Sequence, residues 1–139
     1  MPSIIALTDL VVNELNSQPW GFAFQAERTY KPINTQKKIK DLQVECRPSV
    51  RKRTILTRSS DDVELSVEIG IFNQYDDEAE CDALVEFCDA IEGHFVRAKL
   101  DIYMCVEVAT MPIYDENLIG DDSRLFASVI SLKFQWDGT

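Results

Sequence analysis

The sequence predicts one α+β domain spanning residues 1–139, in which two helices pack on one face of a mostly antiparallel sheet. Two apolar periods carry this prediction. The first alternates, as in a strand with one face in a core, over Val63, Leu65, Val67, Ile69 and Ile71. The second recurs at spacings of three and four, as on an amphipathic helix, over Leu84, Val85, Cys88, Ile91 and Phe95. The predicted order is α-β-β-β-β-α-β-β.

The first third of the chain predicts a helix, a strand and a loop. Ser3 is placed to cap a helix from Ile4 to Asn16, and Pro19 ends it because proline lacks the N–H donor that a continuing helix needs. Alternating apolar residues from Phe22 to Tyr30 predict the first strand. The polar, basic stretch from Pro32 to Lys40 predicts a loop.

The next segments predict a charged hairpin. A short strand from Leu42 to Cys46 is expected to stop at Pro48, and a further strand runs from Val50 to Arg58. The turn residues from Ser59 to Asp62 fold this strand back onto the long alternating strand. Because buried charge is costly, we expect the charged hairpin from Val50 to Asp62 at an edge of the sheet or projecting from it.

The second half of the chain predicts a helix and two strands. Asp76 or Asp77 is expected to cap the second helix, and Gly93 to end it. Alternation from Leu100 to Val108 predicts a strand. The closing strand, from Phe126 to Trp136, is apolar on both faces, so we expect it at the centre of the sheet.

Charge is divided unevenly along the chain, whose net charge is −10. Residues 27–58 hold ten basic residues against three acids (+7), whereas residues 59–139 hold nineteen acids against four bases (−15). One interpretation is solvated surface that keeps the protein soluble; the other is complementarity between copies, whose head-to-tail contacts close into rings. The candidate interface residues are Arg47, Arg51, Lys52, Arg53, Arg58, Asp76, Asp77, Asp121 and Asp122.

No constellation of residues predicts catalysis, a metal or a cofactor, so we expect the chain not to be an enzyme. His94 is the only histidine, too few for the usual zinc ligation or a His-based triad. The acidic clusters lack the ligand alternation and turn glycine of a calcium loop, and turns and helix capping explain them. A Gly-rich phosphate loop and a nucleophile elbow are both missing.

The cysteines and the hydropathy indicate the compartment. Cys46, Cys81, Cys88 and Cys105 show no paired spacing, so we expect free thiols in a reducing cytoplasm. The N-terminal residues lack the basic region of a signal peptide, and no apolar run reaches the roughly 18 residues that cross a bilayer. We therefore expect no membrane partner.

A nucleic-acid-binding or small regulatory module is the alternative from a different class. It would use Arg47, Arg51, Lys52, Arg53 and Arg58. Against it, Tyr30 is the one aromatic residue among these charges, no base-reading motif occurs, and the net charge opposes nonspecific DNA binding.

Three stretches together indicate a family. They are the helix Ile4–Asn16 with its Pro-Trp turn and strand; the strand Val63–Phe72 leading through Asp76-Asp77-Glu78 into helical residues 83–91; and Tyr114–Leu118 followed by the strand Phe126–Trp136. In the order of its predicted elements and the residue pattern along them, the chain resembles the tail-terminator and related head-to-tail joining proteins of long-tailed bacteriophages. The resemblance spans nearly the whole chain.

The resemblance implies a virion structural protein that assembles as a ring, commonly a hexamer, on the end of the tail tube. Such a ring stops tube polymerisation and connects the tail to a head-side neck or connector protein, while DNA passes through its pore without specific binding. The implied locations are the virion and, during assembly, the host cytoplasm. The hairpin Val50–Asp62 is the candidate for engaging the tail tube protein. A head-completion or tube subunit of the same fold is the nearest alternative.

Overall fold

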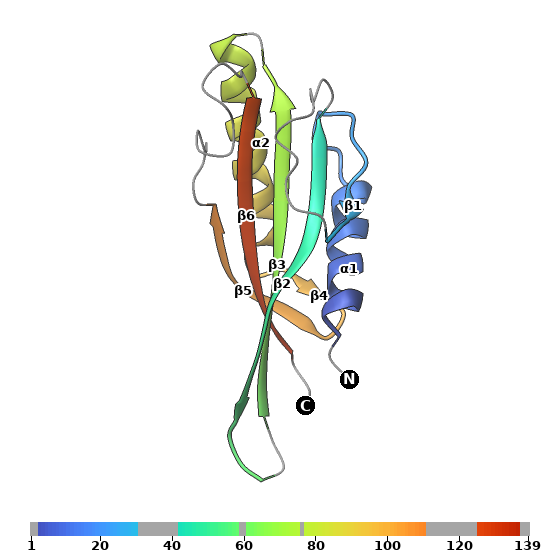
Figure 1. Ribbon diagram of the computed structural model, residues 1–139, viewed down its shortest axis with the longest axis vertical. Helices are drawn as coiled ribbons and strands as arrows, with labels where there is room; N and C mark the ends of the chain where they lie inside the picture. Colours follow the sequence, from blue (N-terminus) through green and yellow to red (C-terminus); the bar gives the residue numbers. More distant parts are fainter. Residues whose placement is uncertain (1–2, 31–41, 59–60, 76, 111–124, 137–139) are drawn as a thin grey trace.

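The computed structural model describes residues 3–30, 42–58, 61–75, 77–110 and 125–136. In chain order the elements are α1 (Ile4–Ser17), β1 (Glu27–Arg28), β2 (Gln43–Ile55), β3 (Asp61–Gln74), α2 (Glu78–Phe95), β4 (Lys99–Leu100), β5 (Tyr103–Thr110) and β6 (Leu125–Trp136). The six strands form one sheet in the order β1-β2-β3-β6-β5-β4. Only β1 and β2 pair in parallel among these strands. Both helices cover the same face (Figure 1), which confirms the predicted α+β class.

The core lies between the helices and the two central strands. Alternate residues of β3 and β6 fill it, as their periods predict: Val63, Leu65, Val67, Ile69, Ile71, Phe126, Ile130, Leu132 and Phe134. The helices contribute Leu7, Val11, Leu15, Leu84, Phe87, Ile91 and Phe95. The predicted central position of β6 is confirmed, because β6 pairs with β3 along one side and with β5 along the other.

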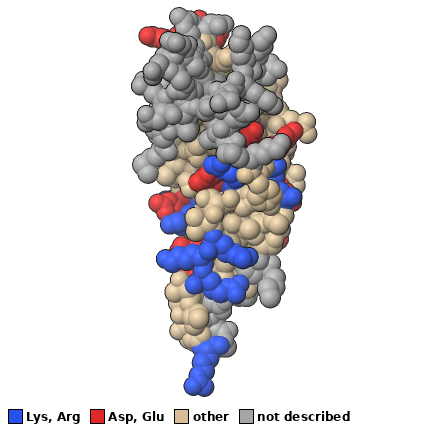
Figure 2. Space-filling view, in the orientation of Figure 1, with Lys and Arg blue, Asp and Glu red and all other residues tan. Residues whose placement is uncertain are grey.

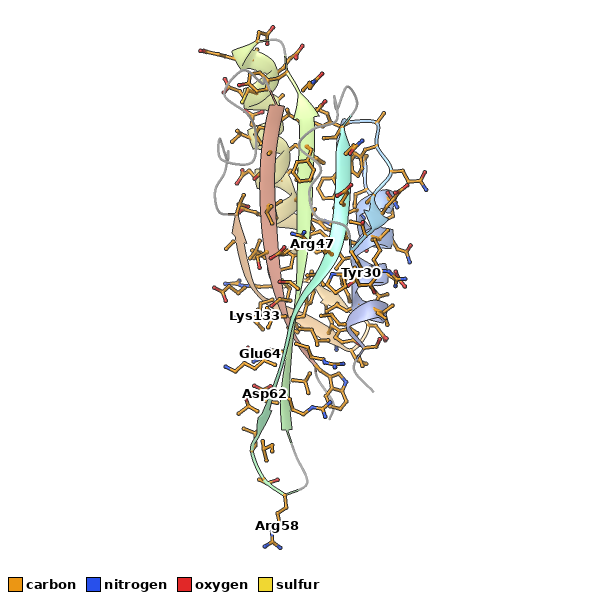
Figure 3. The ribbon with its side chains drawn as sticks, viewed as in Figure 1. Tyr30, Arg47, Arg58, Asp62, Glu64 and Lys133 are labelled. Carbon is orange, nitrogen blue, oxygen red and sulfur yellow. The ribbon has the colours of Figure 1, made fainter. Side chains whose placement is uncertain are left out.

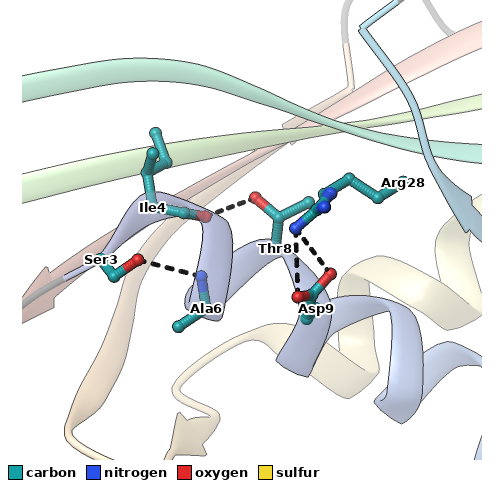
Figure 4. Close-up of polar contacts among 6 residues, drawn as sticks. All are labelled: Ser3, Ile4, Ala6, Thr8, Asp9 and Arg28. Carbon is teal, nitrogen blue, oxygen red and sulfur yellow. Dashed lines mark hydrogen bonds and ion pairs between the residues drawn. The ribbon is translucent and has the colours of Figure 1, made fainter.

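Helix α1 begins at the predicted cap. The Ser3 hydroxyl oxygen accepts a hydrogen bond from the Ala6 N–H at 3.2 Å, and the Thr8 hydroxyl donates to the Ile4 carbonyl oxygen at 2.6 Å (Figure 4). The cap satisfies a backbone donor that has no partner inside the helix.

Two contacts tie α1 to the segment that ends in β1. Arg28 forms an ion pair with Asp9 at 3.1 Å (Figure 4). The Asn16 amide donates to the Ala26 carbonyl oxygen at 3.2 Å and accepts from the Ala26 N–H at 2.7 Å. Asn16 thus replaces the strand partner that the Ala26 backbone would otherwise need.

The predicted strand boundary at Pro48 is wrong. Strand β2 runs through Pro48, so two predicted strands are one and the order becomes α-β-β-β-α-β-β-β. The register of β2 on β3 shifts between Pro48, opposite Val67, and Arg51, opposite Leu65. Two residues of β2 therefore face one of β3, which is a β-bulge, and a strand tolerates proline there because a ladder N–H is not required.

Two other predicted boundaries differ from the structure. The strand predicted from Phe22 to Tyr30 is only β1, because Phe22 and Phe24 pack against Phe87 with ring centroids 5.0 and 5.4 Å apart. Gly93 does not end α2, which continues to the fully buried Phe95. Burial of one aromatic side chain outweighs the modest helix penalty of glycine.

The single strand predicted after α2 is divided into β4 and β5, joined around Asp101, whose φ is +56°. The buried residues are Tyr103 and Cys105, whereas Met104 and Val106 are 38% and 48% exposed. Met104 and Val106 therefore lie on the face turned away from the helices, whereas a register shift between Cys105 and Glu107 places Val108 beside the buried Leu132, against the core. Within the described residues, neither helix has the length and apolarity of a bilayer-spanning segment.

Candidate interaction surfaces

The outer parts of β2 and β3 extend beyond the other strands (Figure 1). Past the bulge, β2 pairs with β3 from Arg51 to Ile55, while β6 reaches β3 only as far as Glu64. In the described part of the chain, β1 pairs with β2 only at Glu45 and Cys46. We call residues 49–58 and 61–64 the arm.

The arm exposes apolar and basic side chains together. Val50, Ile55 and Leu56 are 52%, 79% and 64% exposed. Arg51 and Lys52 are also exposed, and no described residue forms an ion pair with either. Arg58 lies at the far tip and points away from the molecule (Figure 3). Exposed apolar residues among unpaired cations are typical of an interaction surface.

The bulge decides which arm residues share a face. Because it adds one residue to β2, Arg51, Arg53 and Ile55 lie on the face that the core residues of β3 occupy. On the opposite face, Lys52 lies across from Glu64, and Thr54 across from Asp62. One face of the arm therefore combines arginine with exposed apolar surface, and the other mixes charges of both signs.

At the base of the arm, charges are paired inside the protomer. Arg47 Nη2 lies 2.7 Å from Glu68 Oε2, and the Ser49 hydroxyl donates to Glu68 Oε1 at 3.2 Å. Lys133 Nζ lies 3.0 Å from Glu107 Oε2, which raises the pKa of Lys133 through this hydrogen bond and its charge. Figure 3 shows Arg47 and Lys133 above the arm. The division of charge along the sequence is therefore only partly a division in space.

The exposed face of α2 carries a row of carboxylates: Glu78, Asp82, Glu86 and Asp89. Their spacings of four, four and three residues place them on one side of the helix. None of the four forms an ion pair with a described residue. We call these four residues the acidic face of α2. Sequence reasoning missed it, although its helical spacing was a readable signal.

The arm and α2 are separated along the long axis. The first turns of α2 lie at the end of the molecule opposite the arm (Figure 1). Figure 2 shows Lys and Arg side chains gathered toward the narrow end, with Asp and Glu beside other Lys and Arg in the middle of this view. Since the arm is far from the start of its own α2, these two charged surfaces do not neutralise each other within one copy.

The predicted interface residues fall into three groups. Arg51, Lys52, Arg53 and Arg58 lie on the arm, and Arg47 lies at its base in an ion pair. Asp77 caps α2, with its Oδ1 accepting from the Glu80 N–H at 2.9 Å, as its position before the helix predicts. The remaining three, Asp76, Asp121 and Asp122, lie outside the described residues.

A depression beside the Arg47–Glu68 pair has a volume of about 10 Å³, about the least that holds one water. In the same part of the chain, no three His, Cys, Asp or Glu side chains are grouped to hold a metal ion. His94 Nε2 instead lies 2.8 Å from Glu14 Oε1 and joins α2 to α1.

The four cysteines are free, as predicted. Burial raises the pKa of Cys46 from 9.0 to about 12, and the pKa values of Cys88 and Cys105 to about 11. The thiolate is the nucleophile, so these three thiols are unreactive at neutral pH. Cys81 is only partly buried.

We expect a thiol-specific disulfide reagent at pH 7.5 to modify Cys81 in the folded protein and the other three cysteines only after unfolding. A Cys81→Ser variant should then show no rapid modification in the folded state; rapid modification of folded Cys46 would contradict its burial.

The pH dependence of stability gives a second test of the buried thiols. Their contribution to the free energy of unfolding is full below pH 9.0 and is lost as the pH rises through their folded pKa values near 11 and 12. Urea melts across that range should record the loss.

Comparison with known proteins gives no family for this chain. No protein-family model matches the chain, and no protein of curated function matches it.

Proposed function

We propose that this chain is a structural protein of a bacteriophage virion, a tail terminator whose copies form a ring on the end of the tail tube. The observation that carries the proposal is the arm. It holds Val50, Ile55 and Leu56 more than half exposed beside the cations Arg51 and Lys52. A two-stranded ribbon of this kind gains little stability by itself, so its exposed side chains favour a role in assembly.

The two ends of the molecule also support a ring. A head-to-tail ring needs two different complementary surfaces on each subunit. The arm is basic and apolar, and α2, which begins at the other end of the molecule (Figure 1), carries an acidic face. In this proposal, the tail tube protein and a head-side neck or connector protein bind the two rims of the ring, and DNA passes through it without specific binding.

A tail tube subunit or head-completion protein of the same fold is the second candidate, because the exposed edges of the arm would also serve a stacked assembly. The two candidates differ in the product. Tube subunits polymerise into long hollow fibres, whereas terminators stop at one closed ring. Electron microscopy of the purified chain distinguishes them.

The test is an assembly reaction with the tail tube protein of the same phage. We expect single closed rings by native mass spectrometry, and tubes that stop growing once the ring is added. An arm variant lacking its apolar side chains, Ile55→Ser with Leu56→Ser, should leave tubes growing. A strict monomer at every concentration, with no binding to the tube protein, would overturn the proposal. Genes for a tail tube and a tape-measure protein beside this one would support it independently.

A further inference from the structure

We infer that the arm of one copy docks along the acidic face of α2 in a neighbouring copy. The inference rests on the proposed function in one respect only: copies of the chain must associate. It deepens that function by naming which surface of a second copy receives the arm.

The first argument is charge complementarity between an arginine of the arm and the carboxylates of α2. Arg51, on the inferred docking face of the arm, forms no ion pair with a described residue. The same is true of Glu78, Asp82, Glu86 and Asp89 on α2. Carboxylates three and four residues apart on a helix repel one another, so the acidic face weakens α2 in an isolated copy. A cationic neighbour removes that repulsion.

The second argument is the shape and polarity of the two surfaces. The arm face that holds Arg51 and Arg53 also holds Ile55, which is 79% exposed. Beside the acidic face, α2 exposes Ala79 and Ala90, whose short side chains let a ribbon approach the helix closely. Apolar contact with these alanines, bordered by arginine–carboxylate pairs, gives the usual arrangement of an interface with an apolar centre and a polar rim.

The third argument is position. The arm leaves one end of the molecule and α2 begins at the other, so an arm does not reach the first turns of its own α2 (Figure 1). In the proposed ring, each copy gives its arm to one neighbour and receives the arm of the other, so the contact is heterologous. Such contacts repeat from copy to copy until the rotation closes a ring.

The experiment uses the full chain and a matched pair of arm variants. Arg51→Glu reverses a charge on the inferred docking face, and Lys52→Glu makes the same reversal on the opposite face of the same strand. We expect Arg51→Glu to weaken self-association by at least about tenfold in analytical ultracentrifugation, and Lys52→Glu to change it much less. Equal effects of the two variants would overturn the inference.

A charge swap tests the receiving surface. Glu86→Lys alone should also weaken self-association, because it opposes the arm with a like charge, while leaving the melting temperature of the monomer unchanged or higher. Mixed in equal amounts, Arg51→Glu and Glu86→Lys subunits should assemble again, since each arm then meets an α2 of opposite charge in an alternating assembly. A mixture that stays dissociated would overturn the inference.

The outcomes separate this inference from the proposed function. Copies that associate regardless of these charges would contradict the arm–α2 contact and leave the ring standing. If self-association is lost in the single variants and regained in their mixture, but the protein does not stop tube growth, the arm–α2 contact is supported and the terminator function is contradicted. If Arg51→Glu abolishes DNA retention at low salt without changing self-association, the arm is a nucleic-acid surface and the inference is wrong.

Discussion

Leu132→Ala is expected to lower the free energy of unfolding by about 2–5 kcal/mol. Leu132 is fully buried in the central strand β6, opposite Val67 of β3 and Val108 of β5. Because hydrogen-bonded neighbours hold β6 on both sides, the backbone has little freedom to move into the space that the substitution leaves. The loss should therefore include a cavity penalty as well as the lost transfer free energy. Urea unfolding monitored by circular dichroism measures it.

Ser131→Ala is the control for Leu132→Ala. Ser131 precedes Leu132 in β6, but its side chain is exposed on the opposite face. We expect its effect to stay within about 0.5 kcal/mol. A similarly small loss for Leu132→Ala would mean that β6 does not occupy the centre of the sheet.

Gly70→Ala should also destabilise the protein, by about 1–3 kcal/mol, through overpacking rather than a cavity. A Cβ atom on Gly70 would lie 2.7 Å from Cε2 and 3.0 Å from Cζ of Phe72. Phe72 is only 2% exposed, so its ring has little free space into which it can retreat. Thermal or urea melts give the size of the effect. Adding Phe72→Leu should recover part of the loss, whereas an additive double variant would exclude the clash as its cause.

Gly93→Ala provides a contrast of opposite sign. Gly93 lies in helix α2, and a Cβ atom there would meet nothing within 4 Å. Alanine lowers the conformational entropy of the unfolded chain and favours the helix, so we expect a gain of about 0.5–1 kcal/mol. A loss at Gly93 equal to that at Gly70 would point to a general intolerance of the fold and not to the Phe72 contact.

The parts of the fold that depend on a single local sequence pattern could be predicted. The cap of α1 followed from Ser3, and the cap of α2 was limited to Asp76 or Asp77, of which Asp77 accepts from a first-turn N–H group. The faces of β3 and β6 followed from strict alternation. Where a local signal opposed a long-range contact, the long-range contact decided the structure. Helix α2 continues past Gly93 because Phe95 is buried, and β2 continues through Pro48 because a β-bulge accommodates the proline.

The candidate site could be predicted only in part. The basic residues from Arg51 to Arg58 were identified from composition, but their division between two faces depends on a bulge that no local pattern reports. Arg47 was grouped with them, although Glu68 neutralises it across the strand pair. The acidic face of α2 was visible in the spacing of its carboxylates and was overlooked because each acid also suits a solvated helix surface.

The sequence by itself determined the α+β class, the region where each helix begins and the core faces of β3 and β6, because each depends on neighbours within about one turn or one strand. The tertiary structure alone decided which strands meet, which face of β5 is buried and which cations form ion pairs among the described residues. These depend on register and on contacts between residues far apart in the chain. Whether Arg51 is available to a partner and Arg47 is not follows from the position of Glu68, and only the folded sheet sets that position.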